Sequence, residues 1–347
     1  EALREVYDPE IGKSIVELQM VKDIQVENGN VRVEILLTVK GCPLTHTIER
    51  DIKEAIYRLD GVKNVEVHME TMSPEQLKQF VEKIKKRHPL AGLAQVDWVI
   101  AVASGKGGVG KSSVTVQLAF ALQKKGKVVG VFDADVWGPS IAKMLRLEEV
   151  PEAVAPGLIS PPEVKGMKVI SFGSILKEKQ PVIWRGPMVH KALEQLLLDT
   201  LWGKLDYLLI DLPPGTGDVA ISICQLGRID GVVLVTTPQD ISLLDVWKAA
   251  GMFRSMGVPL LGLVENMSYF TCEVCGTQHH IFGSGGAEKL SQEENIPILA
   301  RIPLDPKLRE AGDSGMNFVQ EQPQREASLS FITLAENVIK RLSPGKE

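Results

Sequence analysis

Residues 105 to 113 combine the residue types and the spacing that could bind phosphate. The segment is Gly-Lys-Gly-Gly-Val-Gly-Lys-Ser-Ser, which fits the pattern G-x-x-x-x-G-K-[ST] and has an extra lysine, Lys106, after the first glycine. Glycines let consecutive backbone N–H groups turn toward one anion, and the second lysine reaches the outer phosphates. The chain therefore predicts a nucleotide-phosphate site made by Gly105, Lys106, Gly107, Gly108, Val109, Gly110, Lys111, Ser112 and Ser113.

The segments on either side of this loop support the prediction. Residues 98–103 form a short apolar run of strand length, and residues 114–124 are typical of a helix with an apolar face. A loop between a strand and a helix lies at the positive end of the helix, which favours anions. The pattern is therefore in the structural context that it needs.

Carboxylates follow two of the apolar strands. Asp133 and Asp135 come after the run 128–132, and Asp211 comes after Leu208-Leu209-Ile210. With the hydroxyl of Ser112, such carboxylates could approach the Mg²⁺ that accompanies ATP. Asp133 could instead be a turn or cap residue. Asp211 is harder to explain by packing, because acidic residues are rarely buried without a partner.

Two further loops could contact the nucleotide. Residues 212–218, Leu-Pro-Pro-Gly-Thr-Gly-Asp, could sense the γ-phosphate through backbone N–H groups, or Asp218 could only cap a helix. Asn266 follows the apolar run 260–264 and could bind the base, or only cap a turn. GTP-binding proteins usually carry Asn-Lys-x-Asp after a late strand, and no aspartate follows Asn266 in this way, so the sequence favours ATP.

Cys272 and Cys275 form a Cys-x-x-Cys pair. Two thiolates this close bind a thiophilic metal or form a redox disulfide. One completion of a four-ligand site is internal, through His279 and His280, and would bind zinc. The other is symmetric, with two chains each donating a pair to a [4Fe–4S] cluster. Spacing alone leaves zinc, shared cluster and redox pair open.

The two remaining cysteines give weaker signals. Cys224 lies in an apolar helical stretch and is expected to pack in the core. Cys42, in Gly41-Cys42-Pro43-Leu44, lies where a strand gives way to a helix, so its thiol is either acidified by the helix or a packing residue.

The pattern of apolar runs predicts two domains. Residues 1–88 form a small α/β domain, with strands at 21–26, 31–39 and 62–69, a hairpin turn at 27–30 and helices at 44–59 and 73–86. Residues 89–97 are a linker. Residues 98–343 alternate strands and helices, which predicts a mostly parallel sheet with helices on both faces. The strands expected there are 98–103, 128–132, 168–171, 206–210, 231–236, 260–264 and 298–302.

Composition excludes some classes of protein. The 347 residues carry a formal net charge of −5, which argues against a nucleic-acid partner. Apolar runs stay far below the roughly 20 residues that cross a bilayer, so no membrane role is expected. Four cysteines in a chain of this length do not make a disulfide framework, which favours a cytoplasmic location.

Six segments together resemble one known family. They are residues 105–113, Asp-Ala-Asp-Val-Trp-Gly-Pro-Ser (133–140), Trp-Arg-Gly-Pro-Met (184–188), Asp-Leu-Pro-Pro-Gly-Thr-Gly-Asp (211–218), Glu-Asn-Met-Ser (265–268) and the cysteine pair. In this order they resemble the motifs of Mrp/ApbC-type iron–sulfur carrier proteins, P-loop NTPases of the deviant Walker A class related to MinD and ParA. The first ninety residues resemble the iron–sulfur assembly domain that often precedes them, with Asp8-Pro9-Glu10 and Gly41-Cys42-Pro43-Leu44.

The resemblance implies more than the residues alone do. It implies a homodimeric ATPase that binds ATP and Mg²⁺, receives a [4Fe–4S] cluster from an upstream assembly scaffold, and hands it to apo-proteins. Cys272 and Cys275 of both chains would hold the cluster. Lys106 would reach the partner's nucleotide, and Asp133 or Asp135 would orient the attacking water.

Two other functions remain open at this point. A MinD- or ParA-like positioning ATPase would need a membrane- or DNA-binding surface, for which the last helix, residues 328–342, is a candidate. Its apolar positions, which include Leu329 and Ile332, are however expected to pack on the sheet. A zinc-stabilised ATPase would need His279 or His280.

Overall fold

The computed structural model describes residues 1–8, 13–37, 45–73, 75–77, 91–155, 157–175, 186–226 and 228–343. The chain divides into two compact units. The first comprises Glu1–Val96, Glu152–Pro161 and Gln195–Lys204, and the second comprises Asp97–Pro151, Pro162–Glu194 and Leu205–Glu347. Two short segments from the middle of the chain thus group with the amino-terminal residues.

The first unit is built on a three-stranded sheet of order β1-β2-β3, made by β1 (Val21–Glu27), β2 (Asn30–Leu37) and β3 (Asn64–Thr71). β1 and β2 are antiparallel, and β2 and β3 are parallel. The predicted hairpin turn is confirmed: Asn28 and Gly29 both have positive φ, +51° and +86°, as a tight two-residue turn requires. Helix α1 (Thr45–Tyr57) buries Ile48, Ile52 and Ile56, spaced one turn apart.

Only part of the predicted helix 73–86 lies in the described residues. Ser73 and Gln76 exchange hydrogen bonds at its start, because the Ser73 hydroxyl accepts from the Gln76 N–H and the Gln76 side chain accepts from the Ser73 N–H. Ser73 therefore caps the start of this segment. Cys42, Pro9 and Glu10 lie outside the described residues, as do Trp184 and Arg185.

The second unit contains an eight-stranded sheet. In spatial order its strands are β15 (Ile298–Ile302), β12 (Leu260–Asn266), β11 (Gly231–Thr236), β4 (Val96–Ser104), β10 (Leu205–Asp211), β5 (Val129–Asp133), β9 (Met167–Ser171) and β8 (Glu163–Val164). Neighbouring strands from β15 to β4 are parallel, and so are those from β10 to β9, whereas β8 is antiparallel to β9. All seven predicted strands are present.

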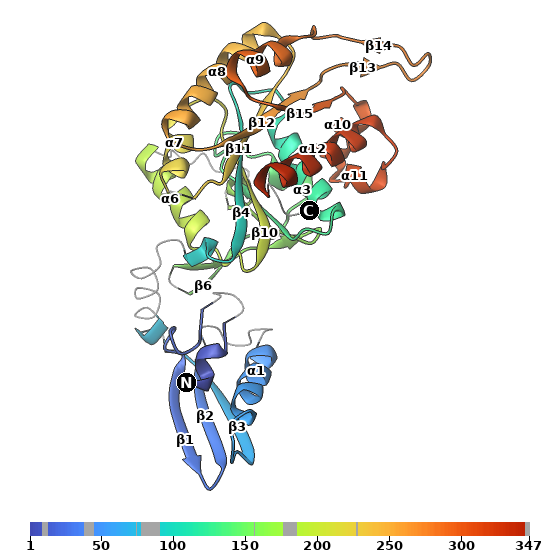
Figure 1. Ribbon diagram of the computed structural model, residues 1–347. Coiled ribbons are helices and arrows are strands. Elements are labelled where there is room, and N and C mark those ends of the chain that lie inside the picture. The colour runs from blue at the N-terminus through green and yellow to red at the C-terminus, as the bar shows by residue number, and fades with distance from the viewer. Residues whose placement is uncertain are drawn as a thin grey trace. The chain divides into compact units, whose positions relative to one another are not determined.

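These strands are continuous apolar runs because both faces of the sheet are covered. Every residue of β5 and β11 is buried. Figure 1 shows α6 (Gly186–Leu198), α7 (Asp218–Gln225) and α8 (Asp240–Ser255) on one face, and α3 (Lys111–Lys124), α10 (Pro306–Ser314) and α12 (Glu326–Leu342) on the other. Helices on both faces of a mostly parallel sheet confirm the predicted α/β class. The remaining helices are α4 (Ile141–Leu145), α5 (Phe172–Ile175), α9 (Gly286–Glu294) and α11 (Phe318–Glu321).

The last helix packs into the core. Phe331, Leu334 and Val338 of α12 are fully buried in the cluster that also holds the sheet and α3, and burial of each such side chain contributes about 1.5–3 kcal/mol. Packing on the sheet was the predicted role, although the buried stripe is centred differently, because Leu329 is exposed and Ile332 is only partly buried. Among the described residues, no helix has both the length and the apolar character needed to cross a bilayer.

Candidate functional site

The loop between β4 and α3 has a backbone that only glycine can adopt. Gly108 and Gly110 have φ of +82° and +81°. A Cβ on Gly110 would lie 2.3 Å from Asn266 Nδ2, and one on Gly105 would lie 2.3 Å from the Asp245 carbonyl carbon. Helix α3 starts without a side-chain cap and without an acidic residue in its first turn. Its positive end is thus available to an anion, and the loop fits a nucleotide phosphate.

Lys111 lies buried among acidic groups below this loop. Its Nζ is 2.7 Å from Asp211 Oδ2, 4.0 Å from Asp135 Oδ2 and 3.4 Å from Ser112 Oγ. The Lys111 side chain is 6% exposed, so its charge needs these partners. Lys106 is only half-buried, and its carbonyl oxygen accepts from Ser104 Oγ. The two lysines of the motif therefore lie in different surroundings.

The carboxylate of Asp211 accepts hydrogen bonds from two hydroxyl groups of α3. Fully buried at the end of β10, it accepts from Ser112 Oγ at 2.5 Å and from Thr115 Oγ1 at 2.7 Å. Thr115 was missed in the sequence. The signal was its spacing of four from Lys111, which puts both on one face of the helix. We use the name phosphate site for residues 105–113 together with Asp135 and Asp211.

The two aspartates of the segment 133–135 differ in role. Asp133 pairs in register with Asp211 across β5 and β10, is fully buried, and accepts from Ser171 Oγ at 2.8 Å and from the Asp135 N–H at 3.2 Å. Burial first, and then the charge of Asp211, raise the pKa of Asp133 to about 7. Asp135 accepts from the Gly138 N–H and faces Lys111. Asp133 therefore supports the loop, while Asp135 points into the phosphate site.

Residues 212–218 are attached to the end of β4. The Gly215 N–H donates to the Ser104 carbonyl oxygen at 2.8 Å, and the Leu212 N–H donates to that of Val102 at 3.0 Å. Proline has no N–H, so the backbone donors left for a phosphate are those of Thr216, Gly217 and Asp218, all exposed. Asp218 is the first residue of α7.

Asn266 touches the phosphate loop itself. This residue at the end of β12 is buried, and its Nδ2 donates to the Val109 carbonyl oxygen at 2.8 Å. Its proximity also explains why residue 110 must be glycine. The structure therefore gives Asn266 a role in fixing the loop that the sequence did not predict.

Cys272 and Cys275 lie at the turn of a short antiparallel hairpin, β13 (Phe270–Thr271) and β14 (Gln278–His279), which extends from the second unit (Figure 1). The Gly276 N–H donates to the Cys272 carbonyl oxygen at 2.8 Å. Cys272 is partly exposed, and Cys275 is exposed. The Thr277 hydroxyl, 3.3 Å from Cys275 Sγ, is the main cause that lowers the pKa of Cys275. We call residues 270–279 the cysteine hairpin.

The histidines do not complete an internal metal site. His279 is in β14, and the His280 ring packs edge-on against Tyr269 with centroids 6.3 Å apart. In the described ranges, no three His, Cys, Asp or Glu side chains gather as a metal-binding group. The cysteine hairpin thus offers two accessible thiols to a thiophilic ligand. Mg²⁺ needs fewer protein ligands, because it keeps waters and shares phosphate oxygens, so Ser112 with Asp211 and Asp135 fits it.

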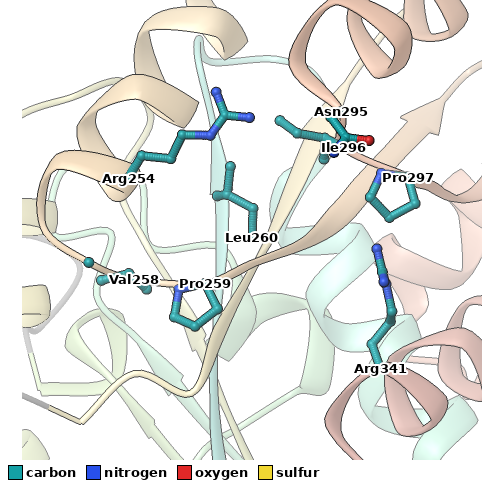
Figure 2. Close-up of a pocket in the computed structure, with 9 residues that line it drawn as sticks. Arg254, Val258, Pro259, Leu260, Asn295, Ile296, Pro297 and Arg341 are labelled. Carbon is teal, nitrogen blue, oxygen red and sulfur yellow. The ribbon is translucent and has the colours of Figure 1, made fainter. Parts of the chain in front are cut away.

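A cavity of about 350 Å³ lies at the amino-terminal ends of β12 and β15, whereas the phosphate loop follows the carboxyl end of β4. Arg254 and Arg341 are among the residues that line the cavity (Figure 2). Arg254 pairs with Glu294, and Arg341 Nε donates to the Leu261 carbonyl oxygen at 3.3 Å. No predicted site residue lines this cavity.

Cys224, which was predicted to pack in the core, is buried, and burial raises the pKa of its thiol to about 11.

Comparisons with known proteins agree with this geometry. The family model described as NUBPL iron-transfer P-loop NTPase matches residues 95–339, and a model of iron–sulfur cluster assembly proteins matches residues 1–69. An iron–sulfur cluster carrier protein of Synechocystis is 41% identical over 346 residues, 98% of this chain and 96% of that protein. The mouse iron–sulfur cluster transfer protein NUBPL is 46% identical over 266 residues, 76% of this chain and 82% of that protein.

Solved structures resemble about 70% of this chain. A nucleotide-binding protein from Archaeoglobus fulgidus in complex with ADP is 37% identical, with a TM-score of 0.60 over 72% of this chain and 96% of that one. MinD from Pyrococcus horikoshii with Mg-ADP is 26% identical, with a TM-score of 0.53 over 70% of this chain and 96% of that one. Motifs, fold and family model agree, so the chain belongs to the family of NUBPL-type iron-transfer P-loop NTPases.

Proposed function

We propose that this protein is an ATP-hydrolysing carrier that holds a [4Fe–4S] cluster between two copies of the chain and transfers it to apo-proteins. The observation that carries the proposal is the presence of a phosphate site and a two-thiol hairpin on one compact unit. Only five residues lie between Asn266, which touches the phosphate loop, and Cys272. Nucleotide and cluster therefore bind to connected parts of the structure.

The nucleotide half of the proposal assigns a task to each polar group. The loop's glycines and the start of α3 cradle the phosphates, and Lys111 leaves its ion pair with Asp211 to neutralise them. Ser112 and Asp211 hold Mg²⁺, which supplies charge neutralisation at the transferred phosphate. Asp135, which faces this space, orients the attacking water. The base is adenine, bound near Asn266.

The second lysine acts on the other copy of the chain. Lys106 lies beside Gly107 and Gly108, which are exposed, so its ammonium group can extend away from its own chain. A cation supplied by a partner stabilises the charge that develops during phosphoryl transfer, as an arginine finger does. Hydrolysis would then require the dimer, and it would be slow until the dimer closes.

The cluster half of the proposal rests on ligand count. A [4Fe–4S] cluster takes four thiolates, and each chain offers Cys272 and Cys275 at an exposed turn. A twofold dimer supplies the four sulfurs. The cluster is cargo: it arrives from an upstream assembly scaffold and leaves to apo iron–sulfur proteins. Residues 1–88, as a separate assembly-type domain joined by the linker 89–97 to the ATPase of residues 98–343, would take part in this exchange.

Reconstitution with iron and sulfide under anaerobic conditions tests the proposal. We expect about two irons per chain, because one four-iron cluster is shared by two copies, and a dimer in which ATP is bound. Replacing both cysteines (Cys272→Ala with Cys275→Ala) should remove iron and chromophore. Cys224→Ala, at a buried thiol, is the matched control and should retain both.

Three outcomes would contradict the proposal. They are a full chromophore in the double variant, a protein that stays monomeric with cluster and ATP, or bound zinc that depends on His279 or His280. Co-sedimentation with liposomes or DNA in the presence of ATP would instead support a positioning ATPase.

A further inference from the structure

Two adjacent residues at the start of α12 hold the cysteine hairpin against the rest of the second unit. Glu326 uses both carboxylate oxygens: Oε1 accepts from the Tyr269 hydroxyl at 2.6 Å, and Oε2 accepts from Thr271 Oγ1 at 3.0 Å. Tyr269 directly precedes β13, and Thr271 is the last residue of β13, next to Cys272. Glu326 thus holds the chain at two points before the first thiol, one just ahead of the hairpin and one within it.

Arg325 contacts the hairpin nearer to its turn. One of its terminal nitrogens is 2.7 Å from Glu273 Oε1, inside the Cys-x-x-Cys turn, while its Nε is 2.7 Å from Asp305 Oδ2. The Asp305 side chain is only 7% exposed, and its other oxygen caps α10 by accepting from the Lys307 N–H. Arg325 therefore connects a fixed part of the core to the turn that carries both thiols.

The hairpin needs such contacts. Its two strands have two residues each, and an isolated two-stranded hairpin is at best marginally stable in water. The Ser268 N–H donates to the Ile302 carbonyl oxygen and the Leu304 N–H donates to that of Tyr269, so these backbone hydrogen bonds fix the two residues that precede the hairpin. Beyond Tyr269, among the residues that the structure describes, Glu326 and Arg325 supply the side-chain contacts to Thr271 and Glu273.

Charge gives Arg325 a second task. Glu273 is an exposed carboxylate between two cysteines that would carry negative charge when they bind iron. Two like charges close together repel, and a nearby guanidinium offsets this repulsion. Glu326, at the first position of α12, is favoured by the helix dipole. The positive charge of Arg325 thus lies next to the carboxylate of Glu273, and the negative charge of Glu326 lies at the positive end of α12.

We infer that Arg325 and Glu326 are positioning residues that set the orientation of the cysteine hairpin, so that the thiols of two copies can meet around one cluster. The inference rests on the proposed function. Because a shared metal site requires its ligands to be placed within about 0.5 Å, a loosened hairpin would still contain both thiols but would bind the cluster poorly. Neither residue touches the cluster in this proposal.

Hydrogen exchange of the cluster-free protein tests the first step. In the variant Arg325→Ala with Glu326→Ala, we expect amides of residues 270–279 to exchange about tenfold faster, since charged hydrogen bonds are lost. Glu336→Ala is the matched control, because it removes a glutamate of the same helix that pairs with Lys125. Unchanged exchange in the hairpin would overturn the inference without touching the proposed function.

Cluster retention tests the second step. After reconstitution, the double variant should lose iron to a chelator about tenfold faster than wild type or Glu336→Ala, with unaltered ATP affinity. Once the cluster has been reduced by one electron with dithionite, its electron paramagnetic resonance spectrum should be shifted from that of wild type. Thr271→Val should lose iron faster as well, whereas Thr271→Ser, which keeps the hydroxyl, should behave as wild type.

If the double variant and Thr271→Val lose iron no faster than wild type and Glu336→Ala, the positioning role is refuted. If wild type itself binds no cluster, or if the double cysteine variant keeps it, the proposed function fails instead.

Discussion

The phosphate site and the cysteine hairpin are built in opposite ways. At the phosphate site, Lys111 and Asp211 are buried and form an ion pair, and Asp133 is buried beside them at the end of β5. At the hairpin, Cys275 and Val274 are exposed, and the turn is held by hydrogen bonds at the surface. The buried groups of the first are paired within their own chain, and of its residues only Lys106 is assigned to the partner's nucleotide. In the proposed function the second is half of a site, and a second copy supplies the other half.

This contrast assigns different consequences to changes in the two regions. A substitution of a buried charge at the phosphate site, such as Lys111 or Asp211, should affect the isolated chain. A substitution at the hairpin leaves the isolated chain intact and should appear only in the assembled, cluster-loaded protein.

Lys106 and Lys111 provide the strongest test, because they are five residues apart in one loop. Lys106→Ala should leave ATP affinity within about threefold of wild type and lower the hydrolysis rate by about 10³-fold, the effect of losing a cation supplied in trans. Single-turnover hydrolysis and nucleotide titration measure the two quantities. Equal loss of affinity in Lys106→Ala and Lys111→Ala would contradict the assignment of Lys106 to the partner's nucleotide.

Lys111→Ala should lower ATP affinity by about 100-fold, since charge-assisted hydrogen bonds to phosphate contribute about 1.5–3 kcal/mol each. The variant should also be less stable without nucleotide, because buried Asp211 loses its ion pair. Cluster binding by the cysteines should persist. Calorimetric titration with ATP and iron analysis of the same preparation check both halves, and a simultaneous loss of iron would show that the two regions are not separable.

Asp133 makes the stability of the nucleotide-free protein depend on pH. Its pKa is raised to about 7 in the folded chain, against about 3.9 when unfolded, so the native state binds the extra proton. Stability is therefore present at low pH and is lost as pH rises through about 7; from pH 6 to 8 the loss is about 1.4 kcal/mol.

Urea unfolding at the two pH values, without Mg²⁺, measures this loss. Asp133→Asn should not show it, whereas Asp313→Asn, at an exposed ion pair with Arg309, should show it like wild type. Parallel pH profiles for wild type and Asp133→Asn would contradict the assignment.

More of the phosphate site than of the cysteine hairpin could be predicted from the sequence, and the reason is physical. Glycines with positive φ, a lysine and carboxylates after buried strands leave local patterns, and so do strands covered on both faces. The partners of Asp133 and Asp211 were partly visible, because Thr115 is one helical turn from Lys111. Ser171, 38 residues from Asp133, gave no such signal.

The hairpin depends on contacts that no local pattern encodes. Glu326 lies 57 residues from Tyr269, and Arg325 lies 52 residues from Glu273. The strands β13 and β14, like β8, have two residues each, too few to show a period of two. The choice between Asp133 and Asp135 likewise depended on which carboxylate the core encloses, which the sequence leaves open.

Val274 offers the mildest test of the contrast. Its side chain is 96% exposed between the two cysteines, so Val274→Ser should change the unfolding free energy of the isolated chain by less than about 0.5 kcal/mol. If the hairpin tip meets a second copy, the loaded dimer should dissociate roughly three- to tenfold more readily, because an apolar contact is lost. Val128→Ser, at an exposed valine that precedes β5, is the control and should alter neither quantity. Sedimentation of the reconstituted proteins decides the matter: a Val274→Ser dimer as tight as wild type would mean that the exposed tip is not covered by another copy.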